Sequence, residues 1–211
     1  YRNIDLPKKF LSSQSKKYVQ KFLEIQKIVK PDIIEVHNRP IYINDLIDLK
    51  SKIVLYFHND PISMMGSKSV SERLFLLNRC SKIIFNSEWS KKQFLRKINK
   101  FYNKSTKLEV IHQSISQTKI DIKNKKKIIT FVGKLNTAKG YDIFGKAIIK
   151  ILDKYKEWSA VVVGDEPREN IFFNHKNLKN FGFKNHKFVL DIFKKSSIAV
   201  ACSRWEEPFG R

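Results

Sequence analysis

The stretch that decides the fold is KIITFVGKLNTAKGYD, residues 127–142. Its apolar start predicts a buried strand that ends at Gly133. A short loop follows, with Lys134 and Lys139 on either side of a polar tip, and Gly140 leads into a segment with helical apolar spacing. A strand, a glycine turn and a helix start bring backbone N–H groups and the positive end of the helix to a point where phosphate binds. The stretch thus predicts a phosphate site; the alternative is an ordinary turn with solvated lysines, because the fuller glycine-rich phosphate motifs are absent.

The composition indicates a packed protein with anionic partners. The chain has 211 residues, 42% of them hydrophobic, and a formal net charge of +22. That charge favours nucleotides, acidic lipid surfaces or nucleic acid as partners. No apolar run approaches the roughly 18 residues of a membrane span. The chain begins without Met and stops at Arg211, directly after a motif, so we expect a fragment of a longer protein.

The cysteines and histidines argue against metal and disulfide chemistry. Cys80 and Cys202 lie far apart and form no paired motif, which fits a reducing compartment. The five histidines show no metal-ligand spacing, so no metal site and no cofactor are expected. There is no nucleophile elbow of the G-x-S-x-G type.

Short apolar strands alternate with helices along the whole chain. The expected strands are 33–36, 53–57, 82–85, 108–111, 128–132, 158–163, 178–183 (a strand and turn) and 197–202. Helices are expected at 15–30, 42–49, 88–97 and 186–195, around Val70, Leu74 and Leu77, and after Gly140, with a flexible loop at 63–69. In the helix at 186–195, Val189, Ile192 and Phe193 should face inward, and Ser87 should cap the helix at 88–97. This alternation predicts an α/β protein of βαβ units with mainly parallel sheets.

The composition changes to Gln, Ser, Thr, Asn and Lys between residues 112 and 126. We therefore predict two Rossmann-like parallel-sheet units, residues 1–114 and 127–211, both incomplete and joined by a linker at 115–126. Ligands of open α/β sheets bind beyond the carboxyl ends of the strands, so a ligand is expected in a cleft between the units. The polar residues that follow the strands are His37, Arg39, His58, Asp60, Lys134, Lys139, Asp165 and Glu207.

Several of these residues have a plain structural alternative. His58 follows an apolar strand and either binds a substrate, acts as a base or caps its loop, whereas for His37 a structural role is favoured. Glu206 and Glu207 beside Arg204 would read as a solvated charge cluster if Pro-Phe-Gly did not follow them directly.

The second half resembles the retaining glycosyltransferases of family 4 (glycosyl transferases group 1), which have the GT-B fold. The matching segments are FVGKLNTAKG at 131–140, VVVGDEP at 161–167, LKNFGF at 178–183, VLDIFKKSSIAVACS at 189–203 and RWEEPFGR at 204–211. The first half agrees more loosely, through PDIIEVHNRP at 31–40, LYFHNDP at 55–61 and CSKIIFNSEWSKKQFL at 80–95. The resemblance implies that residues 1–114 form the acceptor-side domain and residues 127–211 the nucleotide-sugar domain.

The resemblance also implies roles for individual residues. Lys134 and Lys139 would hold the donor diphosphate, Glu207 would contact the donor sugar, and His58 would approach that sugar at the reaction centre. His58 and Glu207 are thus the catalytic candidates. The other donor-binding candidates are Gly133, Gly164, Phe183, Pro208, Phe209 and Gly210, and the acceptor-side candidates are His37, Arg39 and Asp60.

The implied function is a hexosyl- or glycosyltransferase of the EC 2.4 class that acts with retention, without metal. It would move sugar from a nucleotide-sugar donor to a glycan or lipid-linked acceptor in the synthesis of cell-surface polysaccharide or lipopolysaccharide. A cytoplasmic location is expected, with peripheral contact to an anionic membrane. The family's second motif glutamate would fall beyond Arg211, which leaves activity of this chain alone open. The alternatives are a non-catalytic nucleotide-sugar-binding or assembly module and, on charge alone, a nucleic-acid-binding protein.

Overall fold

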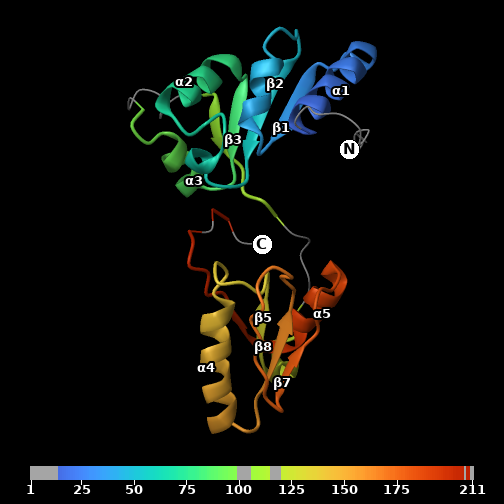
Figure 1. Ribbon diagram of the computed structural model, residues 1–211, viewed down its shortest axis with the longest axis vertical. Helices are drawn as coiled ribbons and strands as arrows, with labels where there is room; N and C mark the ends of the chain where they lie inside the picture. Colours follow the sequence, from blue (N-terminus) through green and yellow to red (C-terminus); the bar gives the residue numbers. More distant parts are fainter. Residues whose placement is uncertain (1–13, 99–105, 115–119, 207, 210–211) are drawn as a thin grey trace. The chain divides into compact units, whose positions relative to one another are not determined.

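The computed structural model describes residues 14–98, 106–114, 120–206 and 208–209. The chain divides into two compact units, which we call unit 1 (residues 1–115 with 208–211) and unit 2 (residues 116–207). Each unit has its own four-stranded sheet flanked by helices (Figure 1), and all neighbouring strands are parallel. The predicted α/β class with two parallel-sheet units is therefore confirmed.

The sheet of unit 1 follows the order of the chain. Its strands are β1 (Ile33–His37), β2 (Lys52–Phe57), β3 (Lys82–Phe85) and β4 (Leu108–Val110), in the spatial order β1-β2-β3-β4. Its helices are α1 (Gln14–Val29), α2 (Val70–Arg79) and α3 (Glu88–Phe94). Alternate residues of β1, β2 and β3 are buried, as expected for strands with one face on the core.

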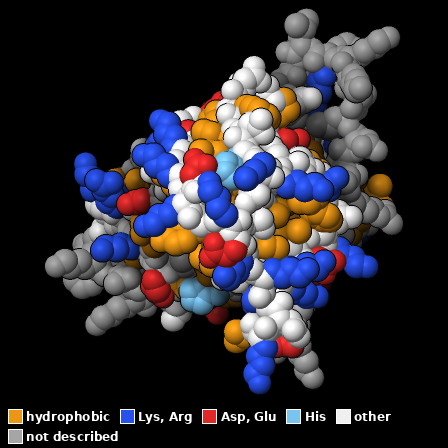
Figure 2. Space-filling model, turned by 90° about the horizontal axis from the view of Figure 1, so that it is seen from below, with side chains coloured by type: hydrophobic (Ala, Val, Ile, Leu, Met, Phe, Trp, Pro, Cys, Tyr) orange, Lys and Arg blue, Asp and Glu red, His pale blue; other side chains and the backbone are white. Residues whose placement is uncertain are grey.

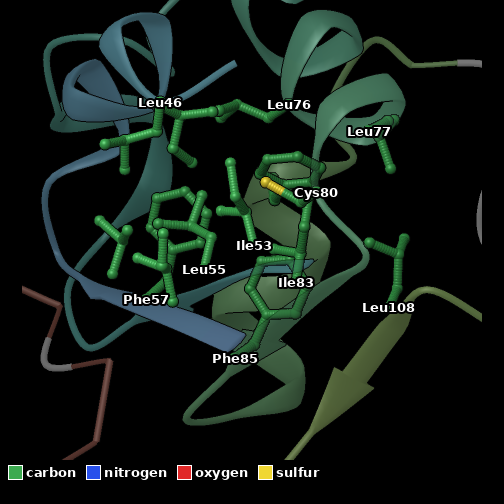
Figure 3. Packing of buried hydrophobic residues seen from close by; sticks show 14 residues of the cluster. Leu46, Ile53, Leu55, Phe57, Leu76, Leu77, Cys80, Ile83, Phe85 and Leu108 are labelled. Atoms are coloured by element: carbon green, nitrogen blue, oxygen red, sulfur yellow. The ribbon is translucent and has the colours of Figure 1, made fainter. Parts of the chain in front are cut away.

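Helix α2 covers this buried face. Leu76 and Leu77 of α2 belong to one buried cluster with Ile53, Leu55 and Ile83 of the strands (Figure 3), and Leu77 lies on the side of Leu108. Removing apolar surface of this extent from water is the main favourable contribution to folding. The core thereby fixes the strands whose carboxyl ends carry the polar residues.

Two predictions in unit 1 need correction. Residues 42–49 do not form an α-helix; a 3-10 helix, η1 (Pro40–Asp45), stands there instead. Pro40 begins it, and Ile43 and Leu46 are buried at a spacing of three, which matches the tighter 3-10 period. Helix α3 ends at Phe94, three residues before the predicted end. The predicted N-cap is confirmed, because the Ser87 side chain accepts a hydrogen bond from the Ser90 backbone N–H.

The loop at 63–69, predicted to be flexible, is anchored. The hydroxyl of Ser67 donates to the Pro61 carbonyl at 2.5 Å. Arg73, 3% exposed, donates to the Ser67 carbonyl at 3.1 Å and to the Lys68 carbonyl at 2.7 Å. Gly66 has a φ of +91° and packs so closely that a Cβ there would clash with the backbone of Ile41. The sequence shows only small and polar residues here, so this anchoring depends on partners from other elements.

The sheet of unit 2 has a crossover. Its strands are β5 (Lys126–Val132), β6 (Ser159–Val163), β7 (Leu178–Asn180) and β8 (Ser196–Val200), in the spatial order β7-β6-β5-β8. Helices α4 (Tyr141–Lys154) and α5 (His186–Lys195) flank the strands (Figure 1). Of the predicted linker at 115–126, residues 120–126 are described; they include a short 3-10 helix, η4 (Ile122–Asn124), and Lys126 already belongs to β5.

The two helices of unit 2 differ in how deeply they are buried. The apolar side of α4 lies in the core, where Phe144, Ile148 and Leu152 are almost inaccessible to solvent. Val189 and Ile192 of α5, together with the neighbouring Phe193, are only half-buried, although their helical spacing predicts an inward face. The strong packing of α4 fixes the position of its N-terminus, where the decisive stretch of sequence enters the helix.

Candidate functional site

The strand ends of unit 2 meet at a pair of glycines. Gly133 follows β5 and Gly164 follows β6, and the Gly133 N–H donates to the Val163 carbonyl at 3.0 Å. Gly164 has a φ of +141°, and a Cβ there would overlap the Gly133 carbonyl oxygen. The two glycines predicted to bind the donor therefore lie side by side. Their lack of side chains allows the backbones of β5 and β6 to approach each other closely at this point.

Helix α4 starts directly after the loop that carries the two lysines. Its N-cap residue, Gly140, has a φ of +72°, and a Cβ there would overlap the Cys202 carbonyl oxygen. Within the loop, the Lys139 N–H donates to the Asn136 side-chain oxygen at 2.9 Å, and the Tyr141 N–H donates to the Asn136 carbonyl at 3.1 Å. Only glycine combines this backbone conformation with this close approach, so the turn into α4 is sterically specified.

Lys134 and Lys139 both belong to this loop, as predicted, but their environments differ. Lys134 is exposed, whereas Lys139 is half-buried, with its Nζ 5.2 Å from the centre of the Trp205 ring. A cation over an indole face is attracted by the ring's quadrupole. Lys139 is thus oriented by an aromatic side chain from the segment that precedes the Glu-Pro-Phe-Gly motif.

Arg204 connects that segment to the start of α4. Its guanidinium donates to both carboxylate oxygens of Asp142, at 2.5 and 2.7 Å, and to the Thr137 carbonyl at 2.6 Å. Its backbone N–H also donates to the Ala138 carbonyl at 2.9 Å. The hydrogen bonds from Arg204 lower the pKa of Asp142 to about 2, so the carboxylate in the first turn of α4 is ionised and paired.

Two carboxylates that follow β6 also contact this loop: Glu166 accepts from the Asn136 side-chain nitrogen at 3.5 Å, and Glu169 binds Thr137. Arg168 forms a two-point ion pair with the buried Glu166 at 2.6 and 2.8 Å, and its hydrogen bonds lower the pKa of Glu166 to about 2. Lys134 contributes a smaller electrostatic lowering of that pKa. Glu169 accepts hydrogen bonds from the Thr137 N–H at 2.9 Å and from its hydroxyl at 2.5 Å. Hydrogen bonds with Glu169, Arg204 and Asn136 thus hold the loop at several points.

Phe183 lies next to the glycine pair. It is 75% exposed and follows Gly182, which has a φ of +64°. The Gly182 carbonyl accepts a hydrogen bond from the Gly164 N–H at 2.9 Å. The role of Phe183 at the border of a base site stays a prediction.

The motif at the end of the chain is described only in part. Glu207 and Gly210, a predicted catalytic residue and a predicted donor-binding residue, lie outside the described residues. Pro208 is buried, and the half-buried Phe209 stacks on His112 with ring centroids 5.7 Å apart, both within unit 1. Their donor-binding role stays a prediction.

In unit 1, the two candidate histidines contact each other. Nδ1 of His37, the last residue of β1, lies 2.7 Å from Nε2 of His58, which follows β2, and their rings are nearly parallel. The Gln113 side-chain nitrogen forms a hydrogen bond with Nδ1 of His58. The other nitrogen of His37 lies 3.3 Å from Oε1 of Glu35.

The backbone of His58 is held as firmly as its ring. Its N–H donates to the Asn38 side-chain oxygen at 3.0 Å, and its carbonyl accepts from the Asn86 side-chain nitrogen at 2.7 Å. Asn38 adopts the left-handed conformation, with a φ of +57°, that this contact requires. The ring of Tyr56 lies 4.3 Å from that of His58. His58 is therefore a fixed group at the carboxyl edge of the sheet.

The two remaining candidates of unit 1 have local partners. Asp60 caps the 3-10 helix η2 (Pro61–Ser63), where its side chain accepts from the Ile62 N–H at 3.2 Å. Arg39 is exposed and donates to the Asn38 carbonyl at 3.1 Å. An acceptor-side role for either residue stays a prediction.

The sequence did not predict three residues that shape these sites, Gln113, Glu166 and Glu169, nor the pairing of Arg204 with Asp142. A usable signal existed for Gln113 and Glu166, since each closely follows a strand, and the carboxyl ends of parallel strands meet at one edge.

Within residues 14–98, 106–114, 120–206 and 208–209, no group of three or more His, Cys, Asp or Glu side chains could hold a metal ion. Among the helices of that same part of the chain, none is long and apolar enough to cross a membrane.

Comparisons with known proteins agree with the fold. Residues 112–211 match the family model described as glycosyl transferases group 1. No curated protein matches the sequence. Among solved structures, the chain resembles Anabaena Alr3699/HepE in complex with UDP-glucose, at 16% identity and a TM-score of 0.68, with 92% of this chain and 59% of HepE covered.

Two further structures resemble this chain. The catalytic domain of Starch Synthase IV from Arabidopsis thaliana bound to ADP and acarbose matches at 15% identity and a TM-score of 0.63, over 96% of this chain and 59% of that one. The lipopolysaccharide outer core galactosyltransferase WaaB matches at 17% identity and a TM-score of 0.56, over 92% of this chain and 56% of that one. These similarities establish a fold of the GT-B type. This chain spans less than two thirds of the length of the structures compared.

Proposed function

We propose that this protein takes part in retaining glycosyl transfer from a nucleotide-sugar donor, with unit 2 as the donor-binding unit and unit 1 as the acceptor-side unit. The observation that carries the proposal is the braced loop between Gly133 and α4, which has Lys134 at its start and Lys139 directly before the N-cap of α4. The match of residues 112–211 to the glycosyl transferases group 1 model supports the same chemistry. The nucleotide and nucleotide-sugar complexes of the compared structures also support it.

The chemistry follows from the charge that develops on the leaving group. As the glycosidic bond to the donor phosphate breaks, negative charge grows on the diphosphate. Lys134, Lys139 and the N-terminal end of α4 are positive groups that would stabilise this charge without a metal ion or another cofactor. Because the loop is already held by Arg204 and Glu169, little reorganisation is needed when the charge appears.

The remaining candidates complete the proposed donor and acceptor sites. Gly133, Gly164 and Phe183 would border the nucleotide, and Glu207 with the Pro-Phe-Gly motif would contact the donor sugar. In unit 1, His58 would contact a sugar hydroxyl, with His37, Arg39 and Asp60 on the acceptor side.

The acceptor that we propose is a glycan or glycolipid of the cell surface, such as lipopolysaccharide, at the inner face of a membrane. The formal net charge of +22 supports contact with anionic lipid headgroups. Lys and Arg side chains are scattered among apolar ones over the face shown in Figure 2, which fits a diffuse surface attraction. The two cysteines are free thiols, in keeping with a cytoplasmic location.

The test is turnover of a panel of nucleotide sugars by the full-length protein, with products identified by mass spectrometry. Lys139→Ala and Glu207→Ala should each lower kcat/KM by at least about tenfold, because each removes a group proposed to contact the donor. Undiminished turnover in both variants would remove the site assignment. Nucleotide-sugar binding without turnover by the wild type would instead favour the non-catalytic module.

A further inference from the structure

A line of hydrogen-bonding side chains crosses the carboxyl edge of the sheet in unit 1. It runs from Gln113, which follows β4, through His58 after β2 to His37 at the end of β1, where Glu35 lies nearby. The central step joins two imidazole nitrogens 2.7 Å apart. Hydrogen bonds therefore join the side chains of Gln113, His58 and His37, and the Glu35 carboxylate lies 3.3 Å from the second nitrogen of His37.

The chemistry of the end groups fixes the direction of the hydrogen bonds. A neutral imidazole has one donor and one acceptor nitrogen, and an amide nitrogen only donates. The amide nitrogen of Gln113 faces Nδ1 of His58, so that Nδ1 is the acceptor and Nε2 carries the proton. Nε2–H then donates to Nδ1 of His37, whose own proton lies on Nε2, 3.3 Å from the Glu35 carboxylate. All three contacts are thus satisfied when both histidines carry their proton on Nε2.

The two partners of the His58 ring differ in how readily they move. His37 belongs to strand β1, which pairs with β2 throughout its length. Gln113 lies beyond the end of β4, its side chain is half-buried, and it reaches His58 through three rotatable bonds. The His58 ring is held by its hydrogen bond to His37 and lies against the rings of His37 and Tyr56. Gln113 is thus the partner that a ligand can replace.

We propose that Gln113 is a placeholder whose amide is replaced by a sugar hydroxyl, which then donates a hydrogen bond to Nδ1 of His58. His37 and Glu35 are positioning residues that keep the proton of His58 on Nε2 and leave Nδ1 as the acceptor. This inference rests on the proposed function, because it takes a sugar as the ligand. It specifies which nitrogen of His58 faces the substrate and that this nitrogen accepts.

The first test needs no substrate. Nitrogen-15 NMR of the histidine rings in the 211-residue chain should show Nδ1 of His58 unprotonated. Gln113→Glu keeps the size of the side chain but offers only acceptors, so Nδ1 of His58 should become protonated in that variant. Gln20→Glu, on the exposed part of α1, adds the same charge and should leave the His58 signals unchanged. A protonated Nδ1 in the wild type, or an unprotonated one in Gln113→Glu, would overturn the proposal.

The second test uses turnover by the full-length protein with UDP-glucose and the other donors of the panel. Gln113→Ala should keep kcat/KM within about threefold, since a placeholder is dispensable, whereas Gln113→Glu should lower it at least about tenfold by occupying the acceptor nitrogen with a proton. His37→Ala should also lower kcat/KM, and His37→Asn, which keeps an acceptor near His58, should restore part of it.

The outcomes separate this inference from the function on which it rests. Equal losses in Gln113→Ala and Gln113→Glu would indicate a structural role for Gln113 and contradict the placeholder. Absence of turnover by the wild type with every donor would refute the proposed function, and the hydroxyl replacement would fail with it. The tautomer assignment is judged by NMR alone in either case.

Discussion

Arg204 neutralises Asp142 at the very turn where helix α4 begins. The two side chains form a two-point ion pair, at 2.5 and 2.7 Å, although 62 positions separate them in the sequence. An ionised carboxylate near a helix N-terminus is favourable for the helix but repels another anion that binds there. The ion pair resolves this conflict, because it leaves the start of α4 without an unpaired negative charge next to the two lysines.

The first prediction concerns this pair. Arg204→Ala should weaken the binding of UDP by about three- to tenfold, since Asp142 is left as an unpaired anion and the Thr137 carbonyl loses its donor. Adding Asp142→Asn to Arg204→Ala should restore part of the affinity. Isothermal titration calorimetry of the wild type, both single variants and the double variant measures this coupling. Strictly additive losses would show that the pair does not act on the phosphate site.

The second prediction is a loss of stability in acid. The pKa of Asp142 lies at about 2 against an ordinary value of 3.8, and that of Glu166 at about 2 against 4.5. A carboxylate whose pKa is lower in the folded state than in the unfolded state stabilises the folded protein at any pH above its unfolded-state pKa. This stabilisation is lost as the pH falls from the unfolded-state pKa to the folded-state pKa. The melting temperature should therefore drop between about pH 4.5 and pH 2. Circular dichroism should show a shallower drop for Asp142→Asn and Glu166→Gln; slopes equal to the wild type would contradict the pairing.

The third prediction tests the steric role of the glycine pair. Gly164→Ala should destabilise the protein by at least about 2 kcal/mol, because the new methyl group would overlap the Gly133 carbonyl and the backbone conformation is strained for alanine. Gly182→Ala is the matched control: it also has a positive φ, but nothing lies within 4 Å of its added carbon. It should cost only about 1 kcal/mol. Urea unfolding distinguishes the two, and equal losses would argue against close packing at the strand ends.

The fourth prediction concerns the anchored loop of unit 1. Arg73→Leu should destabilise the protein by about 3 kcal/mol, because the buried guanidinium donates to three backbone carbonyls, those of Ser67, Lys68 and Arg96. The loop around the exposed Met65 should also become accessible to proteases. Arg79→Leu, at the end of the same helix, is the control and should change neither property much. Protease resistance equal to the wild type in Arg73→Leu would show that the loop is held by other contacts.

Local sequence signals predicted the elements but not their partners. The strands at 33–36, 53–57 and 82–85 were predictable because apolar side chains on a packed sheet leave a clear record in the sequence. Ser87 as an N-cap was predictable because its partner, the Ser90 backbone N–H, lies only three residues away in the sequence. The 3-10 helix at Pro40–Asp45 was missed because a buried spacing of three over a few residues resembles the start of an α-helix.

Most of the features that the sequence did not predict are side-chain contacts between residues far apart in the chain. His37 and His58 were each recognised as strand-end residues, but their contact depends on the parallel pairing of β1 with β2. The partners of Arg204 depend likewise on how the segment after β8 returns to α4. Such pairs are fixed by topology, and one sequence records only that the residues follow strands.

The most direct test of the account is the affinity of the chain for UDP, measured by isothermal titration calorimetry with two matched lysine variants. Lys139 and Lys154 both lie over an aromatic ring, but Lys139 precedes the start of α4 and Lys154 lies in its last turn. We predict that Lys139→Ala weakens UDP binding at least about tenfold and that Lys154→Ala leaves it within about twofold. Equal affinities of the two variants, or no UDP binding by the wild type, would contradict a diphosphate site at this helix N-terminus.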